Sequence, residues 1–349
     1  MTLEDTTNEL YEKTKDKFVD NGYNVFRLNF DDALNSTHYN PFNFPYDLYK
    51  KGNKDKAQEL IEDLGFYLLN DIEEKNSDPF WMNSTIDYFT GITLYAFENE
   101  SHVDLNKIFE IDSEIRNNPV EFIKGIDKKS NIYINLRGVL EAPNETRGSI
   151  FSVFNQKIKK YISKDNLKEM MKKTDFDITS FGKEKTIIYI FSGHSNNFES
   201  LLPLLISQVY FAKDYYNKKE GKISIIIDNF FDLYPFKNFG KMLNYSRSIG
   251  IMFTIMIRGF NDLKNTYGKE QAEIIKLCFV NLVYLLSQDV NTLEEISDLC
   301  GNASIDDNKK IPLISVSELK TLKLFEAVII TPRIMPFKTQ LLPYYKMEK

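Results

Sequence analysis

The sequence predicts an α/β protein in which a mostly parallel sheet is interrupted by an all-helical segment. Three apolar runs, KTIIYIFS, KISIIID and IGIMFTIMI, have the length and continuity of strands buried on both faces. Helical patterns separate these runs, and this alternation is typical of parallel strands joined by crossover helices. We therefore predict a discontinuous α/β domain from residues 1–48 and 142–349, and an all-helical domain from residues 49–141.

The elements follow from local patterns along the chain. ELYEKTKDKFVDNGY reads as an amphipathic helix closed by Asn21-Gly22, and NVFRLNF follows it as a strand. Four patterns with apolar residues at three- and four-residue spacing then predict helices within residues 53–74, 79–100, 104–115 and 119–129. Beyond residue 142 we predict helices within 145–162, 197–216, 236–248, 269–280 and 291–300, and further strands at 281–287 and 326–332.

Composition excludes several classes of protein. With 44 Lys and Arg against 50 Asp and Glu, the net charge is −6, so any contact with nucleic acid needs a local basic face. The two cysteines and three histidines are scattered without metal-ligand spacing, which excludes a structural zinc site. The apolar windows LLPLLISQVYFA and LCFVNLVYLLS are too short to span a bilayer, so we expect a chain without a transmembrane segment.

The run KISIIID ends in Asp228, and a strand-end carboxylate has two interpretations. In a nucleotide-driven motor it sits on the metal side of the phosphates. In other proteins such an acid caps the turn that follows the strand. The sequence contains no G-x-x-x-x-G-K-[ST] phosphate loop.

The segment from Lys157 to Lys173 carries seven lysines. Lysines on such a helix can follow a nucleic-acid backbone, and the candidates are Lys157, Lys159, Lys160 and Lys164. The interspersed Asp165 and Glu169 favour a solvated surface instead. Aromatic residues in the helical segment at helical spacing are typical of a core, although aromatics also stack on single-stranded DNA.

Several segments, in order, resemble the type IV coupling proteins, the conjugative DNA-transfer ATPases of the TraG/TraD type. The segments are NELYEKT, YNPF, DPFW, DNFFDLYPF, SRSIGIMFTIMIRGFNDLKNTYG and LKTLKLFEAVIITPRIMPFKTQLLPYYK. The resemblance extends over nearly the whole chain. It implies a RecA-like fold of the P-loop NTPase type, with the α/β domain as a partial motor domain and the helical domain inserted in it.

The resemblance also implies roles for four residues. Asp228 matches the Walker B-like acid on the metal side, and Asn229 stands at the position of the catalytic Glu. Arg247 stands at an arginine-finger position that acts on a neighbouring subunit, and Arg258 at the position of a sensor Gln. Arg258 can bind a phosphate or pair with Asp228.

The departures from the family concern nucleotide chemistry. The family binds ATP and Mg²⁺, but its phosphate loop is expected upstream of residue 1, and Thr7 replaces a lysine of the family's Asp-Pro-Lys-Gly-Glu segment. Asn229 can hydrogen-bond to water but cannot take its proton. We therefore expect no nucleotide bound by this chain alone and a degenerate ATPase site.

Three functions remain open. The first is a coupling-protein-like component of a conjugative type IV secretion system, expected in the cytoplasm at the inner face of the cell membrane. Its partners would be channel proteins, relaxase–DNA substrate or single-stranded DNA, and an intact homologue in a hetero-oligomer. The second is the carboxyl-terminal part of an active DNA translocase whose Walker A segment lies upstream. The third is a DNA- or protein-binding module.

Overall fold

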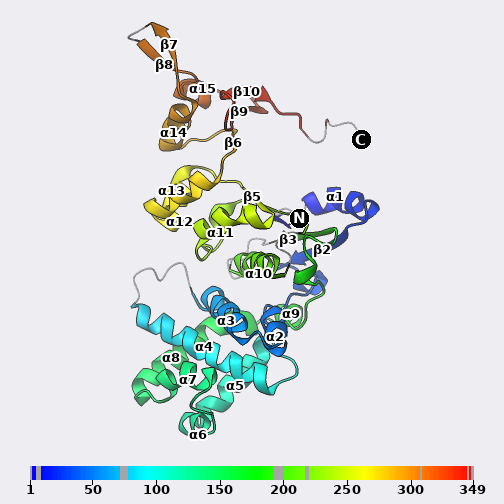
Figure 1. The fold of residues 1–349 in the computed structure, drawn as a ribbon, viewed down its shortest axis with the longest axis vertical. Helices are drawn as coiled ribbons and strands as arrows, with labels where there is room; N and C mark the ends of the chain where they lie inside the picture. Colours follow the sequence, from blue (N-terminus) through cyan, green and yellow to red (C-terminus); the bar gives the residue numbers. More distant parts are fainter. Residues whose placement is uncertain are drawn as a thin grey trace. The chain divides into compact units, whose positions relative to one another are not determined.

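The computed structural model describes residues 2–4, 9–70, 78–191, 200–216, 220–306, 309–343 and 346. The chain divides into two compact units (Figure 1). Unit 1 consists of residues 1–228, 232–237 and 246–254, and unit 2 consists of residues 229–231, 238–245 and 255–349.

Unit 1 contains a five-stranded sheet with the order β2-β3-β1-β4-β5. The strands are β1 (Thr2–Glu4), β2 (Asn24–Asn29), β3 (Thr186–Phe191), β4 (Ile223–Ile227) and β5 (Ile251–Ile255). Strand β1 is central and pairs in parallel with β3 and β4, and β2 pairs in parallel with β3. The predictions of β2 to β5 are confirmed. No strand was predicted at β1, because three residues are too short to show a period.

Helix α1 (Glu9–Asp20) covers part of one face of this sheet. Its Tyr11 and Phe18 pack against Tyr189 of β3, with ring centroids 5.3 and 6.4 Å apart. Helix α10 (Leu201–Tyr216) forms the connection before β4 and is apolar on most of its surface. Its Lys213 is buried, and its ammonium group donates to the carbonyl oxygens of Glu220 and Gly221 just before β4.

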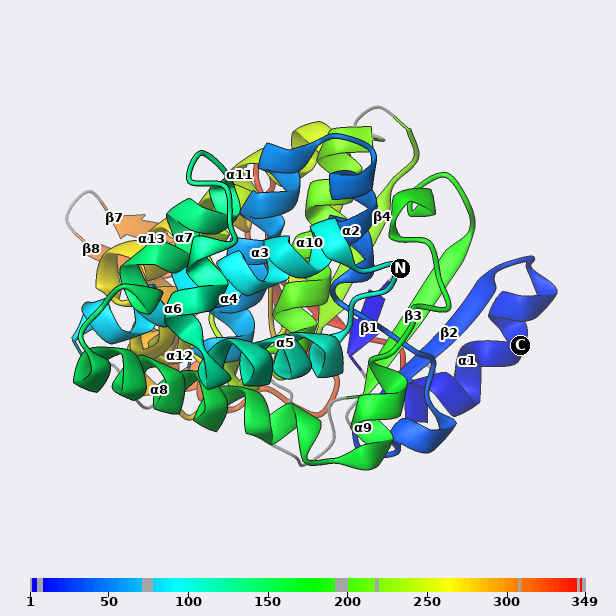
Figure 2. The ribbon, with the colours of Figure 1, turned by 90° about the horizontal axis from the view of Figure 1, so that it is seen from below.

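The helical part of unit 1 runs further than predicted. It comprises α2 (Asn43–Lys50), α3 (Lys54–Leu69), α4 (Pro79–Asn99), α5 (Leu105–Asn117), α6 (Pro119–Lys124), α7 (Asn131–Leu140), α8 (Asn144–Ile162) and α9 (Asp165–Met170). Figure 2, seen from below, shows α4 with α3, α5, α7 and α8, all of which contact it. Since α8 packs on α4, the helical segment does not stop at residue 141 in this structure.

Four side chains cap these helices and explain where they begin. The carboxylate or amide oxygens of Asp78, Asp104 and Asn118 and the hydroxyl of Ser130 accept backbone N–H groups of the first turns of α4 to α7. Pro79 and Pro119 occupy the first helical position, where a missing N–H costs nothing. Local sequence therefore dictates these helix starts.

The contact between α4 and α7 depends on a glycine. A Cβ atom on Gly91 would lie 2.5 Å from Cγ of the buried Leu136. Gly91→Ala is therefore expected to lower the free energy of unfolding by about 1–3 kcal/mol, because the two helices must separate or Leu136 must leave its rotamer. Urea unfolding followed by circular dichroism measures this.

Gly138 on α7 is the matched control. It is exposed, and a Cβ atom there would meet nothing within 4 Å. Gly138→Ala is expected to keep or raise stability by up to about 1 kcal/mol, since alanine is the better helix former. A loss of stability in Gly138→Ala equal to that in Gly91→Ala would contradict the packing argument.

Unit 2 contains helices and two antiparallel sheets. The helices are α11 (Phe239–Ser246), α12 (Phe260–Tyr267), α13 (Lys269–Cys278), α14 (Val290–Cys300) and α15 (Val316–Lys320). Strands β6 (Leu282–Tyr284), β9 (Glu326–Ile330) and β10 (Phe337–Gln340) form one sheet, and β7 (Asn302–Asp306) pairs with β8 (Lys309–Pro312). The strands predicted at 281–287 and 326–332 exist, but they pair antiparallel to each other and not within a parallel sheet.

Within the part of the chain that the structure describes, none of the helices has the length and apolarity needed to cross a membrane.

Candidate functional site

Asp228 lies where the sequence predicts it, directly after β4. The side chain is half-buried at the carboxyl edge of the parallel sheet, which is the edge where α/β proteins bind ligands. The next residue, Asn229, has a left-handed backbone with φ of 48°. Asparagine tolerates this conformation better than a glutamate would, since its short side chain can hydrogen-bond locally. Residues 5–8, which include Thr7, and residues 192–199 lie outside the described residues.

Arg247 lies at the opposite edge of the same sheet. It begins a short 3₁₀ turn (Arg247–Ile249) that leads through Gly250 into β5. The Ile223 N–H donates to the Gly250 carbonyl at 2.9 Å, so β4 and β5 start at the same edge. A five-residue strand is about 16 Å long, so the exposed Arg247 and Asp228 of one chain do not form one site.

Arg258 belongs to unit 2, where two partners hold it. Its guanidinium lies 3.4 Å from the centroid of the Phe231 ring, and its Nε is 3.5 Å from a carboxylate oxygen of Asp262. The side chain is 68% exposed. Asp228 belongs to unit 1, so the predicted pairing of Arg258 with Asp228 stays a prediction.

Among the described connections, none has the glycine-rich form of a cradle for the phosphates of ATP. Such a cradle needs a glycine-rich turn between the carboxyl end of a strand and a helix. The described glycines with positive φ lie in other kinds of connection, and they are Gly22, Gly52, Gly182, Gly221, Gly250, Gly268 and Gly301. Within the described ranges there is also no group of three or more His, Cys, Asp or Glu side chains that could hold a metal. Asp228 as a ligand of a nucleotide-bound metal stays a prediction.

The basic run from Lys157 to Lys173 is divided between two helices, because α8 ends at Ile162 and α9 begins at Asp165. Lys157 is only 2% exposed, so its selection as a DNA contact is wrong: a buried ammonium cannot reach a phosphate backbone. Lys159 is exposed, Lys160 lies over the Tyr161 ring at 5.1 Å, and Lys164 precedes the first residue of α9. These three stay predictions.

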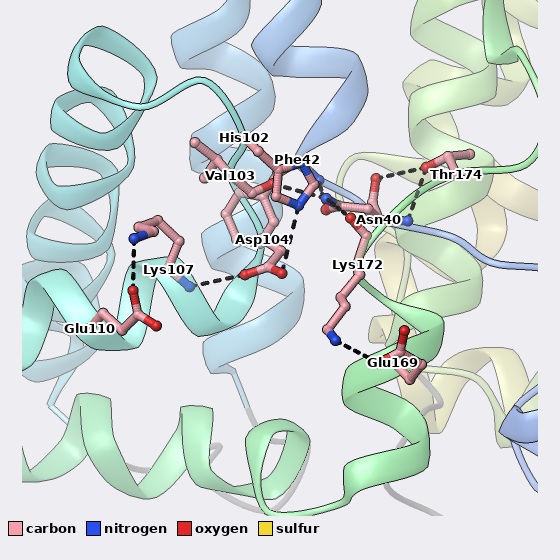
Figure 3. Close-up of polar contacts among 10 residues, drawn as sticks. All are labelled: Asn40, Phe42, His102, Val103, Asp104, Lys107, Glu110, Glu169, Lys172 and Thr174. Carbon is pink, nitrogen blue, oxygen red and sulfur yellow. Dashed lines mark hydrogen bonds and ion pairs between the residues drawn. The ribbon is translucent and has the colours of Figure 1, made fainter.

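The structure adds a polar pocket that local sequence patterns did not indicate. We call it the α5–α9 pocket, and it has a volume of about 400 Å³. Its lining residues come from the start of α5, the segment before it, α9 and the turn after α9, and they are His102, Asp104, Asn106, Lys107, Glu110, Lys168 and Lys172. Figure 3 shows His102, Asp104, Lys107, Glu110 and Lys172. Lys168 and Lys172 continue the four-residue spacing of Lys160 and Lys164, which was a usable signal. Lys107 is about sixty residues away in sequence and could not be grouped with them.

The buried Asn40 holds two walls of this pocket together (Figure 3). Its side-chain amide donates to the carbonyls of Val103, at 2.9 Å, and Lys172, at 3.1 Å. Its side-chain oxygen accepts the Phe42 N–H at 2.9 Å, and its own N–H donates to the Thr174 hydroxyl at 2.9 Å. One amide therefore ties the segment before α5 to the turn after α9.

Nearly the whole chain matches a known protein family. The model of the family described as "Type IV secretory system Conjugative DNA transfer" matches residues 2–349. The chain belongs to this family. The resemblance to coupling proteins that the sequence motifs indicated is thereby confirmed. Among curated proteins, the comparison finds no match.

Solved structures of low identity share the fold of this conjugative DNA transfer protein. A structure of the plasmid coupling protein TrwB with ADP and Mg²⁺ is 14% identical, with a TM-score of 0.64, and the match covers 98% of this chain and 84% of that chain. TrwB with the non-hydrolysable ATP analogue ADPNP gives a TM-score of 0.66 at 14% identity and the same coverage. VirB4 of Thermoanaerobacter pseudethanolicus gives 0.57 at 10% identity, covering 99% of this chain and 83% of that chain. These likenesses confirm the predicted RecA-like fold class.

Proposed function

We propose that this chain is a coupling-protein-like component that links DNA substrate to a conjugative type IV secretion channel and does not itself turn over ATP. Membership of the conjugative DNA transfer family is the observation that carries the first half of this proposal. The chain would act at the cytoplasmic face of the cell membrane, with channel proteins and relaxase-bound or single-stranded DNA as partners.

The residues around Asp228 support the second half. Catalysis of phosphoryl transfer needs a cradle for the phosphates and a base or water-positioning group next to the metal-side acid. The 349 residues contain no G-x-x-x-x-G-K-[ST] string, and the residue after Asp228 is Asn229. The loss of a general base alone typically costs ~10²–10⁴ in rate. A TrwB structure contains ADP and Mg²⁺. In a mixed oligomer, ATP and Mg²⁺ would therefore be bound by an intact homologue and not by this chain.

The position of Arg247 supports such a mixed oligomer. Its guanidinium has no ion-pair or hydrogen-bond partner among the described residues, and it is exposed at the edge away from Asp228. An arginine finger acts on nucleotide held by a neighbouring subunit, and this position leaves the side chain available to one. We propose that Arg247 serves a homologue's site and not a site of its own chain.

The experiment is a steady-state ATPase assay on the purified chain with Mg²⁺. We expect no turnover above background for the unmodified chain, and the same result for Asn229→Glu and Asp228→Ala. Asn229→Glu restores the base but not the phosphate cradle, so it is expected to change nothing alone. Asp232→Ala, a nearby exposed acid, is the matched control for nonspecific effects.

Measurable Mg²⁺-dependent turnover that Asp228→Ala abolishes and Asp232→Ala leaves intact would overturn the degenerate-site proposal. Turnover that arises only when a phosphate-loop segment is joined before residue 1, together with Asn229→Glu, would instead favour the alternative of a translocase whose Walker A segment lies upstream.

A further inference from the structure

The α5–α9 pocket has no part in the nucleotide chemistry considered above, and it gathers three ammonium groups. Lys107 comes from the first turn of α5, Lys168 from α9 and Lys172 from the turn after it. Three like charges around one open depression of about 400 Å³ favour an anion there, and the two carboxylates that also line it, Asp104 and Glu110, compete with that anion.

The carboxylates that now pair with these lysines are weakly held. Lys107 pairs with Glu110 at 2.7 Å, Lys172 with Glu169 at 2.5 Å and Lys168 with Asp165 at 3.6 Å, each three residues away along the chain. The acids are 61%, 59% and 96% exposed, whereas the lysines are 32%, 48% and 36% exposed. Exposed pairs of this kind contribute about 0–1 kcal/mol, so an anion that reaches several lysines at once can displace these carboxylates.

Of the two acids that line the pocket, Asp104 is the more buried, with its side chain 11% exposed against 61% for Glu110. One carboxylate oxygen accepts the Lys107 N–H at 2.9 Å, which caps α5. The other lies 3.7 Å from Nε2 of His102 (Figure 3). Asp104 therefore fixes the backbone on which Lys107 stands.

The walls are held in place before any ligand arrives. Asn40 bonds to the carbonyls of Val103 and Lys172, one on each side of the pocket. Preorganised walls reduce the entropy that binding costs, because fewer segments need to become ordered.

We propose that the α5–α9 pocket binds a phosphate group through Lys107, Lys168 and Lys172. A tetrahedral phosphate presents oxygens in several directions and so can meet ammonium groups from two sides, which a planar carboxylate does less well. The same chemistry is offered by a nucleic-acid backbone and by a free phosphate. The choice of DNA as the natural source rests on the proposed function.

The first test titrates inorganic phosphate into the full chain and follows backbone amide shifts or heat of binding. Relative to the unmodified chain, Lys168→Gln/Lys172→Gln is expected to bind on the order of 10-fold or more weakly, since each removes a charge-assisted contact. The matched control is Lys56→Gln/Lys124→Gln, which removes the same charge from lysines that also pair with exposed acids three residues away but lie outside the pocket. Equal weakening in both double variants would overturn the proposal.

A second double variant is expected to strengthen phosphate binding instead of weakening it. Glu110→Gln/Glu169→Gln removes two competing carboxylates, so phosphate is expected to bind roughly 2–5-fold more tightly. Both side chains are exposed, so folding should be unaffected. Unchanged or weaker binding in this variant would contradict phosphate as the ligand of these lysines.

A single-stranded oligonucleotide distinguishes the source of the phosphate and separates this inference from the proposed function. If DNA occupies the pocket, the pocket lysine variant binds the oligonucleotide more weakly, and its salt dependence is shallower by ~0.7 in slope for each lysine lost. Oligonucleotide binding that is identical in the unmodified chain and the pocket variant would overturn the pocket and leave the proposed function standing. Phosphate binding without any oligonucleotide binding would support the pocket and overturn its DNA source.

Discussion

Asp112→Ala is expected to lower the free energy of unfolding by about 3–5 kcal/mol, because it leaves a charge and a hydroxyl unpaired inside the helical segment. Asp112, on α5, is 1% exposed. One carboxylate oxygen accepts the Tyr88 hydroxyl at 2.8 Å, and the other lies 2.7 Å from Nε of Arg116. Arg116 also donates to the Phe151 carbonyl at 2.7 Å, so this network joins α4, α5 and α8.

Burying the charged carboxylate of Asp112 costs free energy, and its two partners offset that cost. Burial raises the pKa of its carboxyl, although the bonds from Arg116 and Tyr88 oppose that shift. Removing one partner is therefore expected to cost far more than removing both. Asp112→Leu/Arg116→Met is expected to recover most of the loss, since well-packed apolar groups often replace buried ion pairs without penalty.

Urea unfolding of three variants checks this result. Glu121→Ala, which removes an exposed pair with Lys124, is the surface control and is expected to stay within about 0.5 kcal/mol of the unmodified chain. An Asp112→Ala loss no larger than that of Glu121→Ala would show that the network does not stabilise the helical segment.

Gly221→Ala is the second substitution for which we expect a large effect, about 3 kcal/mol or more of lost stability. A Cβ atom on Gly221 would lie 1.5 Å from the carbonyl oxygen of Gly182, so the backbone itself must move. The φ angle of Gly221 is +58°, which adds about 1–2 kcal/mol for an L side chain. Gly221 also accepts a bond from the buried Lys213, whose pKa burial lowers.

Gly22→Ala separates the two causes. Gly22 has a φ of +75°, but a Cβ atom there would meet nothing within 4 Å. Its substitution is expected to cost only the conformational part, about 1–2 kcal/mol. If thermal unfolding shows the same loss of stability for Gly22→Ala and Gly221→Ala, the close approach of Gly221 to the Gly182 backbone adds nothing to the cost of the substitution.

The local elements of this protein follow from its sequence. Runs of apolar residues determine β3, β4 and β5, and Asp228 therefore lies at a strand end. Helical periodicity and caps such as Asp78 determine most of the helices. These signals are carried by residues within one or two turns of each other, so they can be identified without the fold.

The tertiary structure alone decided which distant residues meet. The sequence gives no sign that β1 lies in the centre of the sheet, because Leu3 of β1 pairs with Tyr189, 186 positions away, and with Ile226, 223 positions away. It also does not show that Lys157 points inward, since α8 packs on helices that precede it by tens of residues.

The same reason places Asp228 and Arg247 far apart and brings the residues of the α5–α9 pocket together. Asp228 and Arg247 are nineteen positions apart in the sequence, yet the direction of parallel strands places them at opposite edges of the sheet. Lys107 and Lys168 are sixty-one positions apart, yet the bonds of Asn40 bring their segments together. Side-chain chemistry is local, but strand direction and long-range hydrogen bonds determine which side chains share a site.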